Sequence, residues 1–175
     1  MAKEQPKTGL KITREQMIQL LNEDLAGEYY QAVIAGTVNS QVPAGAAAPD
    51  RAQKLEPQAW EELAHAMKLA QAIDGLGGKL NVIPQPIQTA NDPGTLLATD
   101  LAHTRETVRR YHERILQAEA MGEGALSRTL RGIIRQEQEL EIQLSAALDD
   151  AGPPAPEIAN QTPLLATNHP ASPRA

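Results

Sequence analysis

Glu62 and His65 are the residues of this sequence best placed to do chemistry together. Their spacing, i and i+3, puts both side chains on one face of a helix. A carboxylate and an imidazole on one face can hold the same Fe, Mn or Zn ion. Such pairs also arise by chance on solvated faces, so the pair alone leaves both interpretations open. Leu69, Ala72 and Leu76 continue the same line, which predicts that this face is buried.

Two further glutamates interrupt apolar lines on other predicted helices. Glu28 continues the line of Leu21 and Leu25, and Glu137 follows Ile133 in the same way. A buried carboxylate is costly unless it is paired or metal-bound, so carboxylates from several helices at one level favour a metal site. The alternative is that both glutamates lie at the edge of the apolar seam and reach water.

Four periodic segments must position these side chains, which makes the expected fold all-α. Thr13 and Gln16 form a capping box at the head of the first segment. Pro57 suits the first position of the second helix, with residues 50–56 adding a turn before it. The expected helices run over about residues 14–40, 57–76, from 93 to the MGEG turn, and from that turn to 148.

The connection between the second and third helices contains KLNVIPQPIQTAND, which has two prolines and is long enough to cross from one end of a helix pair to the other. Short, long and short connections in this order are typical of a four-helix bundle whose facing helices build metal sites. We therefore expect a flexible arm over 1–12, a bundle over 13–150 and a disordered, proline-rich tail over 151–175.

Composition excludes several other functions. The 175 residues include no cysteine, so thiolate zinc sites, iron-sulfur clusters and disulfides are excluded. A formal net charge of -6 disfavours nucleic acid as a partner. No apolar stretch is long enough for a membrane span, and the first residues MAKEQPKTGLK lack an apolar leader segment. We expect a cytoplasmic protein without a membrane partner.

At the level of motifs the sequence resembles the bacterioferritin-like branch of the ferritin-like proteins over about residues 14–150. LNEDLAGEYYQA is similar to the first ligand helix of that family, and the resemblance makes Glu28 a terminal ligand. EELAHAMKLAQAIDGLGG is similar to the second ligand helix, which makes Glu62 a bridging carboxylate and His65 an imidazole ligand. The resemblance implies a ferritin-like four-helix bundle with a long crossover between helices two and three.

The resemblance is only partial in the third and fourth helices, DLAHTRETVRRYHERI and IIRQEQELEIQL. The family has a glutamate ligand where this chain has Thr104, and a histidine ligand where it has Leu140. Glu137 is retained. The expected metal ligands are therefore Glu28, Glu62, His65 and Glu137.

Charge balance indicates what this half-filled site can hold. Three glutamates with one divalent ion are one charge negative, and with two ions they are one charge positive, in a poorly solvated site. We predict one well-held ion and a second position that is weak, transient or empty. Glu141 could turn inward as a substitute ligand, as could His103 or Glu106 if helix three is rotated; a solvated flank is the alternative for all three.

Other side chains near the expected site are aromatic. We interpret Trp60 and Tyr111 as core packing. Haem ligation in the family uses a methionine directly after the bridging glutamate, and that residue is Leu63 here, so no haem is expected.

The function implied by the resemblance is iron binding, in iron uptake and storage or in protection from oxidative stress. Oxidation of Fe(II) by dioxygen or peroxide would be slow or absent, so a ferroxidase-like oxidoreductase activity is uncertain. The resemblance also implies a homo-oligomer, a dimer or a cage. The alternative is a structural or assembly bundle with a vestigial single-metal site. A DNA-protecting miniferritin is disfavoured because the chain has no basic arm.

Overall fold

The computed structural model of the chain describes residues 11–41, 48–83 and 93–151. These residues form four long α-helices and no strand, in the order α1 (Arg14–Gln41), α2 (Ala48–Gly75), α3 (Pro93–Ala120) and α4 (Gly124–Ala151). The all-α prediction is therefore confirmed. The predicted arm over 1–12 and tail over 151–175 lie almost wholly outside the described residues.

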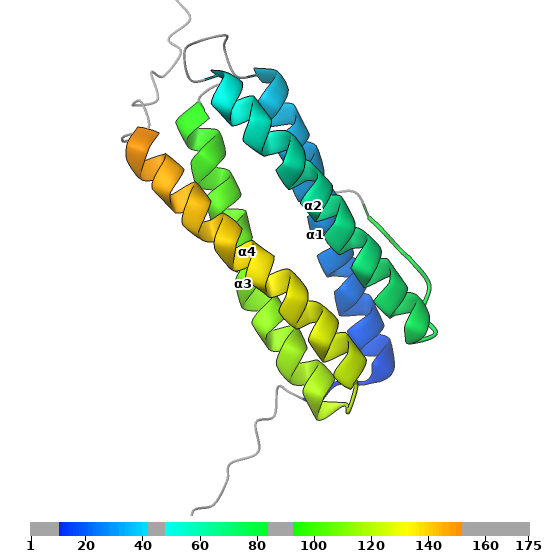
Figure 1. The fold of residues 1–175 in the computed structure, drawn as a ribbon. Helices are drawn as coiled ribbons and strands as arrows, with labels where there is room; N and C mark the ends of the chain where they lie inside the picture. The colour runs from blue at the N-terminus through cyan, green and yellow to red at the C-terminus, as the bar shows by residue number, and fades with distance from the viewer. Residues whose placement is uncertain (1–10, 42–47, 84–92, 152–175) are drawn as a thin grey trace, which may run out of the picture.

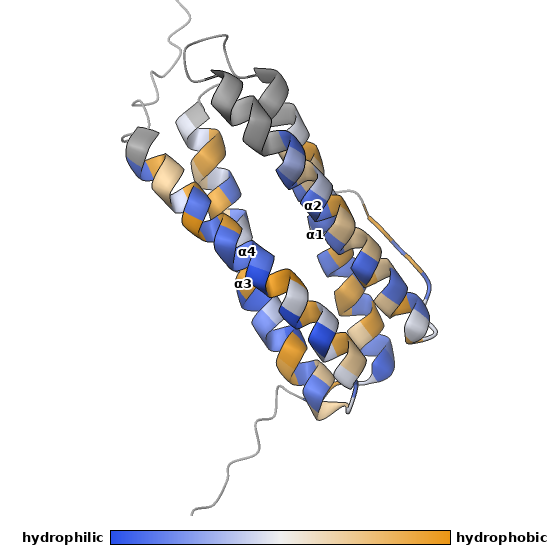
Figure 2. Cartoon of the chain, in the orientation of Figure 1, coloured by the Kyte–Doolittle hydropathy of each residue, from blue (hydrophilic) through white to orange (hydrophobic). Residues whose placement is uncertain are grey.

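The helices pack as two antiparallel pairs, α1 with α2 and α3 with α4 (Figure 1). In the coloured parts of the helices in Figure 2, hydrophilic and hydrophobic residues alternate, so none of these parts is apolar throughout. This pattern suits a bundle with one buried face per helix. Within the described part of the chain, no helix combines the length and apolarity needed to cross a membrane.

Helix boundaries follow local backbone chemistry. The predicted capping box is present, because the Thr13 amide donates to Gln16 Oε1 over 2.8 Å and the Gln16 amide donates to Thr13 Oγ1 over 3.1 Å. At their other ends α2 and α3 stop at glycines with positive φ, 74° at Gly77 and 77° at Gly122. Only glycine adopts this conformation without strain, so these two residues terminate the helices.

The turn expected before Pro57, over residues 50–56, is helical, so the second helix is longer than its predicted main part, 57–76. Pro57 lies inside α2, which begins at Ala48. A proline inside a helix costs roughly 3 kcal/mol. The preceding residues RAQKLE are strong helix formers, however, and α2 continues across the missing hydrogen bond.

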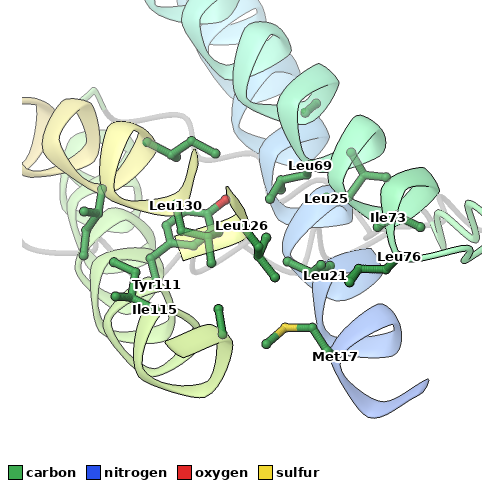
Figure 3. Close-up of a cluster of buried hydrophobic side chains, with 14 residues drawn as sticks. Met17, Leu21, Leu25, Leu69, Ile73, Leu76, Tyr111, Ile115, Leu126 and Leu130 are labelled. Atoms are coloured by element: carbon green, nitrogen blue, oxygen red, sulfur yellow. The ribbon is translucent and has the colours of Figure 1, made fainter. Parts of the chain in front are cut away.

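Two apolar clusters are buried in the bundle, the larger built from all four helices and the smaller from α3 and α4. The larger occupies the end of the bundle shown in Figure 3, where Met17, Leu21 and Leu25 of α1 face residues of the other three helices. The smaller cluster lies toward the other end, around Leu101 and Leu144. These buried positions confirm the apolar lines read from the sequence, and they leave a layer between the clusters that is occupied by polar residues.

The start of the long crossover is held against α1 by Asn22. Its carboxamide nitrogen donates to the Lys79 carbonyl over 3.1 Å, and its oxygen accepts from the Asn81 amide over 2.7 Å. Contact here is close, since a Cβ on Gly78 would lie 2.7 Å from Ile18 Cγ2. Figure 1 shows this segment turning back along the α1 and α2 pair.

We expect Asn22→Ala to lower the free energy of unfolding of the metal-free chain by about 1 to 3 kcal/mol, because two backbone groups of the crossover lose their partner. Urea denaturation followed by circular dichroism measures this. Gln19→Ala, on the exposed side of the same helix, serves as the control and should change stability far less. Equal losses in the two variants would show that Asn22 does not hold the crossover.

Candidate metal centre

The layer between the two apolar clusters contains the four residues predicted as ligands. Glu28 comes from α1, Glu62 and His65 from α2, and Glu137 from α4. Each of the four side chains is only 2% exposed. The alternative that Glu28 and Glu137 lie at the seam edge and reach water is therefore wrong.

The four side chains converge on one point. One ligand atom from each lies within 4.8 Å of the other three. His65 Nδ1 is 3.0 Å from Glu137 Oε1, 3.3 Å from Glu28 Oε2 and 3.5 Å from Glu62 Oε2. Three carboxylates and one imidazole are a donor set that suits Fe(II), Mn(II) or Zn(II).

The hydrogen bonding of these atoms tests whether a metal ion fits. Glu28 Oε2, Glu62 Oε2, His65 Nδ1 and Glu137 Oε1 are all buried, and none of them has a hydrogen-bond partner outside this group of four. Buried polar atoms without partners are costly, and here they point at one another. A divalent cation at their centre would satisfy all four, so the donor set fits a metal.

The histidine is oriented by a residue that the sequence reasoning missed. His65 Nε2 lies 3.1 Å from Gln136 Oε1, and the same oxygen accepts a hydrogen bond from Lys68 Nζ over 3.3 Å. An amide oxygen can only accept, so Nε2 carries a proton, and Nδ1 is the ring nitrogen that faces the three carboxylates. The only sequence signal was the position of Gln136, directly before Glu137.

Tyr111 of α3 contacts the site as well as the core. Its side chain is 1% exposed, as the predicted core packing requires, and its hydroxyl donates a hydrogen bond to Glu28 Oε1. That bond leaves Glu28 Oε2 facing His65. Tyr111 therefore orients a candidate ligand from the opposite helix pair.

We expect Tyr111→Phe to weaken metal binding by about tenfold, the usual effect of removing a hydrogen bond that orients a ligand. Tyr29→Phe makes the same change at a tyrosine that is 43% exposed, and it should leave affinity unchanged. Isothermal titration of the metal-free proteins with Mn(II) measures both. Unchanged affinity in the Tyr111 variant would assign the tyrosine to packing alone.

Burial and mutual repulsion govern the protonation of the centre in the absence of metal. Burial raises the pKa of Glu62 to about 9, with the Glu137 and Glu28 charges adding to the shift. Burial also raises the pKa of Glu137. Burial alone would lower the pKa of His65. Hydrogen bonds to the carboxylates of Glu137, Glu28 and Glu62 outweigh this effect and raise the pKa to about 12.

These shifts predict opposite pH dependences for stability and for metal binding. The folded pKa of Glu62 is raised from 4.5 to about 9, so its stabilising contribution is complete below pH 4.5 and is lost as pH rises to 9. The pKa of His65 is raised from 6.5 to about 12, so its stabilising contribution is likewise lost as the pH rises above 6.5. We therefore expect the melting temperature of the metal-free protein to fall between about pH 6 and 9.

Metal binding should strengthen over the same interval, because a bound ion displaces these protons. Affinity rises by about tenfold per pH unit for each proton displaced. Calorimetric Mn(II) titrations at several pH values measure the affinity. Repeating them in buffers of different ionisation enthalpy gives the number of protons released. An affinity independent of pH would contradict this assignment of protonation states.

The two positions at which the family resemblance expects further ligands hold no metal-binding side chain, as the sequence indicated. Thr104 is fully buried at 0% exposure, and Leu140 packs against the smaller apolar cluster. Of the three substitute ligands, Glu141 accepts a hydrogen bond from Arg105 over 3.1 Å near the surface. Glu106 forms an ion pair with Arg109, and His103 stacks on the Tyr30 ring. Over residues 11–41, 48–83 and 93–151, none of the three joins the four-residue group.

A buried ion pair one turn from Glu28 was also missed. Asp24 is 1% exposed and lies 3.0 Å from Arg114 Nε and 3.2 Å from Arg110 Nε, both on α3. Burial raises the pKa of Asp24 to about 6, against the lowering effect of both arginines. Because its charge is compensated by these arginines, Asp24 ties α1 to α3 beside the site. Ion pairs between helices cannot be read from the spacing of residues within one helix.

The interpretation of Trp60 as a core residue was wrong. The indole is 65% exposed on α2, whereas Glu62, two residues later, faces the interior. A helix rotates by about 200° over two residues, so the two side chains cannot share a face.

The chain matches the model of one protein family, the ferritin-like domain, over residues 18–151. No curated protein sequence matches it. Among solved structures, it is similar to a ferritin-like, diiron-carboxylate protein from Bacillus anthracis str. Ames, with 30% identity, a TM-score of 0.73 and coverage of 77% of this chain and 96% of that chain.

Two more distant structures share the fold. A bacterioferritin from Rhodobacter capsulatus with a metal-free dinuclear site and a heme iron is 22% identical, with a TM-score of 0.72 over 85% of this chain and 99% of that chain. An open pore ferritin from the hyperthermophilic archaeon Archaeoglobus fulgidus is 21% identical, with a TM-score of 0.68 over 78% and 85%. Fold, long crossover and family match agree, and the chain belongs to the ferritin-like family.

Proposed function

We propose that this ferritin-like protein binds iron, with one ion held tightly by Glu28, Glu62, His65 and Glu137. The observation that supports this most strongly is the convergence, within 4.8 Å, of four buried ligand atoms that have no hydrogen-bond partner outside their own group. Geometry and donor type admit Mn(II) and Zn(II) as well. Iron is favoured by the similarity to a diiron-carboxylate protein of the same family.

The missing half of the site limits oxidation of the bound iron. One Fe(II) gives up one electron, whereas two Fe(II) ions together convert O₂ and two protons into hydrogen peroxide. Thr104 and Leu140 offer neither the carboxylate nor the imidazole that would hold a second ion beside the first. We therefore propose slow or absent ferroxidase turnover, and a role in iron uptake, storage or protection from oxidative stress.

A homo-oligomer in the cytoplasm is part of this proposal. Large apolar side chains are exposed along α1 and α2, among them Val33, Trp60 and Met67, with exposures of 46%, 65% and 64%. An apolar helix face of this kind is typical of a surface covered by another subunit. Analytical ultracentrifugation tests it: an oligomer supports the proposal, and a monomer at micromolar concentration contradicts it.

The second candidate function is a structural bundle with a vestigial site. It is favoured by Leu140, which packs against the smaller apolar cluster at a position where the family resemblance expects a metal ligand. An apolar side chain there stabilises the fold but cannot bind a metal. Thermal melting of the metal-free chain with and without anaerobic Fe(II) separates the two functions. A melting temperature that rises with Fe(II) supports iron binding, because only binding to the folded state stabilises it. An unchanged melting temperature supports the structural function.

A further inference from the structure

The four candidate ligands are divided unequally between the two helix pairs. Three of them lie on α1 and α2, and the α3 and α4 pair supplies Glu137 alone. The distance of 3.0 Å between Glu137 Oε1 and His65 Nδ1 therefore depends on how closely the two pairs approach each other at this level. Contacts that join the pairs here also set the geometry of the centre.

Polar contacts between α1 and α3 join the pairs beside the centre. Asp24 lies one turn of α1 before Glu28. Its Oδ2 is 3.0 Å from Arg114 Nε, and its Oδ1 is 3.2 Å from Arg110 Nε. From the same stretch of α3, the Tyr111 hydroxyl donates to Glu28 Oε1. We call Asp24, Arg110 and Arg114 the α1–α3 clamp.

The α1–α3 clamp is buried and directional. The side chains of Asp24 and Arg114 are 1% and 6% exposed, and that of Arg110 is 24% exposed. Arg114 Nη1 also donates to Gln117 Oε1 over 3.2 Å. The helices approach closely, since a Cβ on Gly27 would lie 3.1 Å from Arg110 Nη2. Desolvation offsets much of the attraction in a buried ion pair, but its hydrogen bonds restrict how the two helices can be arranged.

We propose that the α1–α3 clamp positions the metal centre: by fixing the α3 and α4 pair against the α1 and α2 pair, it keeps Glu137 within reach of an ion held by the other three ligands. Arg114, the more buried of the two arginines, is then a positioning residue that acts on the ion through Glu137. The inference rests on the proposed function, because it concerns the affinity of the same site.

The sign of the effect of Arg114 on cation binding separates this role from simple electrostatics. An arginine near a cation site repels the cation, so removal of its charge alone would strengthen metal binding. Loss of the clamp acts in the opposite direction, because Glu137 can then move away from the ion. Arg114 is the suitable residue to change, since Asp24 retains Arg110 as a partner.

Calorimetric titration of the metal-free full-length chain with Mn(II) at pH 8 measures this sign. Burial raises the pKa of Asp24 to about 6, so the α1–α3 clamp is ionised at pH 8. We expect Arg114→Gln to weaken binding by about tenfold, as removal of a group outside the ligand set usually does. Arg114→Lys keeps the charge and should recover part of this loss. Arg109→Gln removes the same charge from an exposed position of α3 and should leave affinity unchanged.

A double-variant cycle shows whether the clamp acts through Glu137. Glu137→Gln should weaken Mn(II) binding by about a hundredfold in the unaltered chain and by about tenfold less than that in the Arg114→Gln background. The role of Arg114 is refuted if Arg114→Gln binds Mn(II) as tightly as the unaltered chain or more tightly, or if Glu137→Gln costs the same in both backgrounds. Failure of the proposed function looks different: the unaltered chain binds no Mn(II), or binds it as tightly after Glu62→Gln.

Discussion

Glu62→Gln is expected to reduce the iron bound to the purified chain from about one ion to a trace, through a loss of affinity of at least about a hundredfold. Glu62 supplies one of the four converging ligand atoms, and the amide that replaces its carboxylate carries no charge. Inductively coupled plasma mass spectrometry of protein reconstituted with anaerobic Fe(II) measures the effect. His65→Gln should have the same effect on iron.

Glu61→Gln is the matched control. Glu61 is the neighbouring residue on α2, but it is exposed and lies on a different face. The same chemical change there should leave iron content unaltered. If Glu62→Gln retained as much iron as Glu61→Gln, the assignment of this site would be wrong.

The metal-free proteins distinguish loss of a ligand from loss of the fold. Burial raises the pKa of Glu62 to about 9, so the glutamine resembles the protonated side chain present at pH 7. The metal-free Glu62→Gln variant should therefore melt no lower than the unaltered chain. His65→Gln should melt lower, because three carboxylates lose the cationic ring that lies 3.0 to 3.5 Å from them.

The double variant Thr104→Glu, Leu140→His should convert the half-filled site into a two-ion site. It adds one carboxylate and one imidazole from α3 and α4, at the two positions where the family resemblance expects ligands. Four glutamates then balance two divalent ions. We expect two tightly bound Fe(II) per chain and an initial rate of iron oxidation by O₂ at least about tenfold higher.

The metal-free double variant should be less stable than the unaltered chain. Thr104 is fully buried, and Leu140 packs with the apolar cluster, so both substitutions place polar groups in the core. Added Fe(II) should more than restore the melting temperature. The single variants are the controls, since neither alone supplies both ligands. A double variant that still binds one ion would show that the backbone no longer accommodates a second.

The burial of the four candidate ligands could be predicted from the sequence because the signals for it are local to single helices. Glu28 and Glu137 occupy apolar register positions, and helix geometry alone then places them inside. The capping box at Thr13 and Gln16 was predictable for the same reason. The spacing of apolar residues by three and four positions, together with one family resemblance, was sufficient to predict the fold and to select the four candidate ligands.

Features that join different helices were not predictable in this way. The contact between Tyr111 and Glu28 depends on how α3 is rotated against α1. Residues 50–56 were expected only as an added turn, because the proline signal was given more weight than the helix formers before it, and α2 begins at Ala48. The exposure of Trp60 was missed because its aromatic character was given more weight than its register.

Anaerobic titration of the metal-free chain with Fe(II), read together with metal analysis, tests the central claim most directly. The structure predicts one tightly bound ion per chain at Glu28, Glu62, His65 and Glu137, with any second ion bound at least about tenfold more weakly. Two equally tight ions would contradict the half-filled site, and the absence of any bound ion would contradict the metal centre itself.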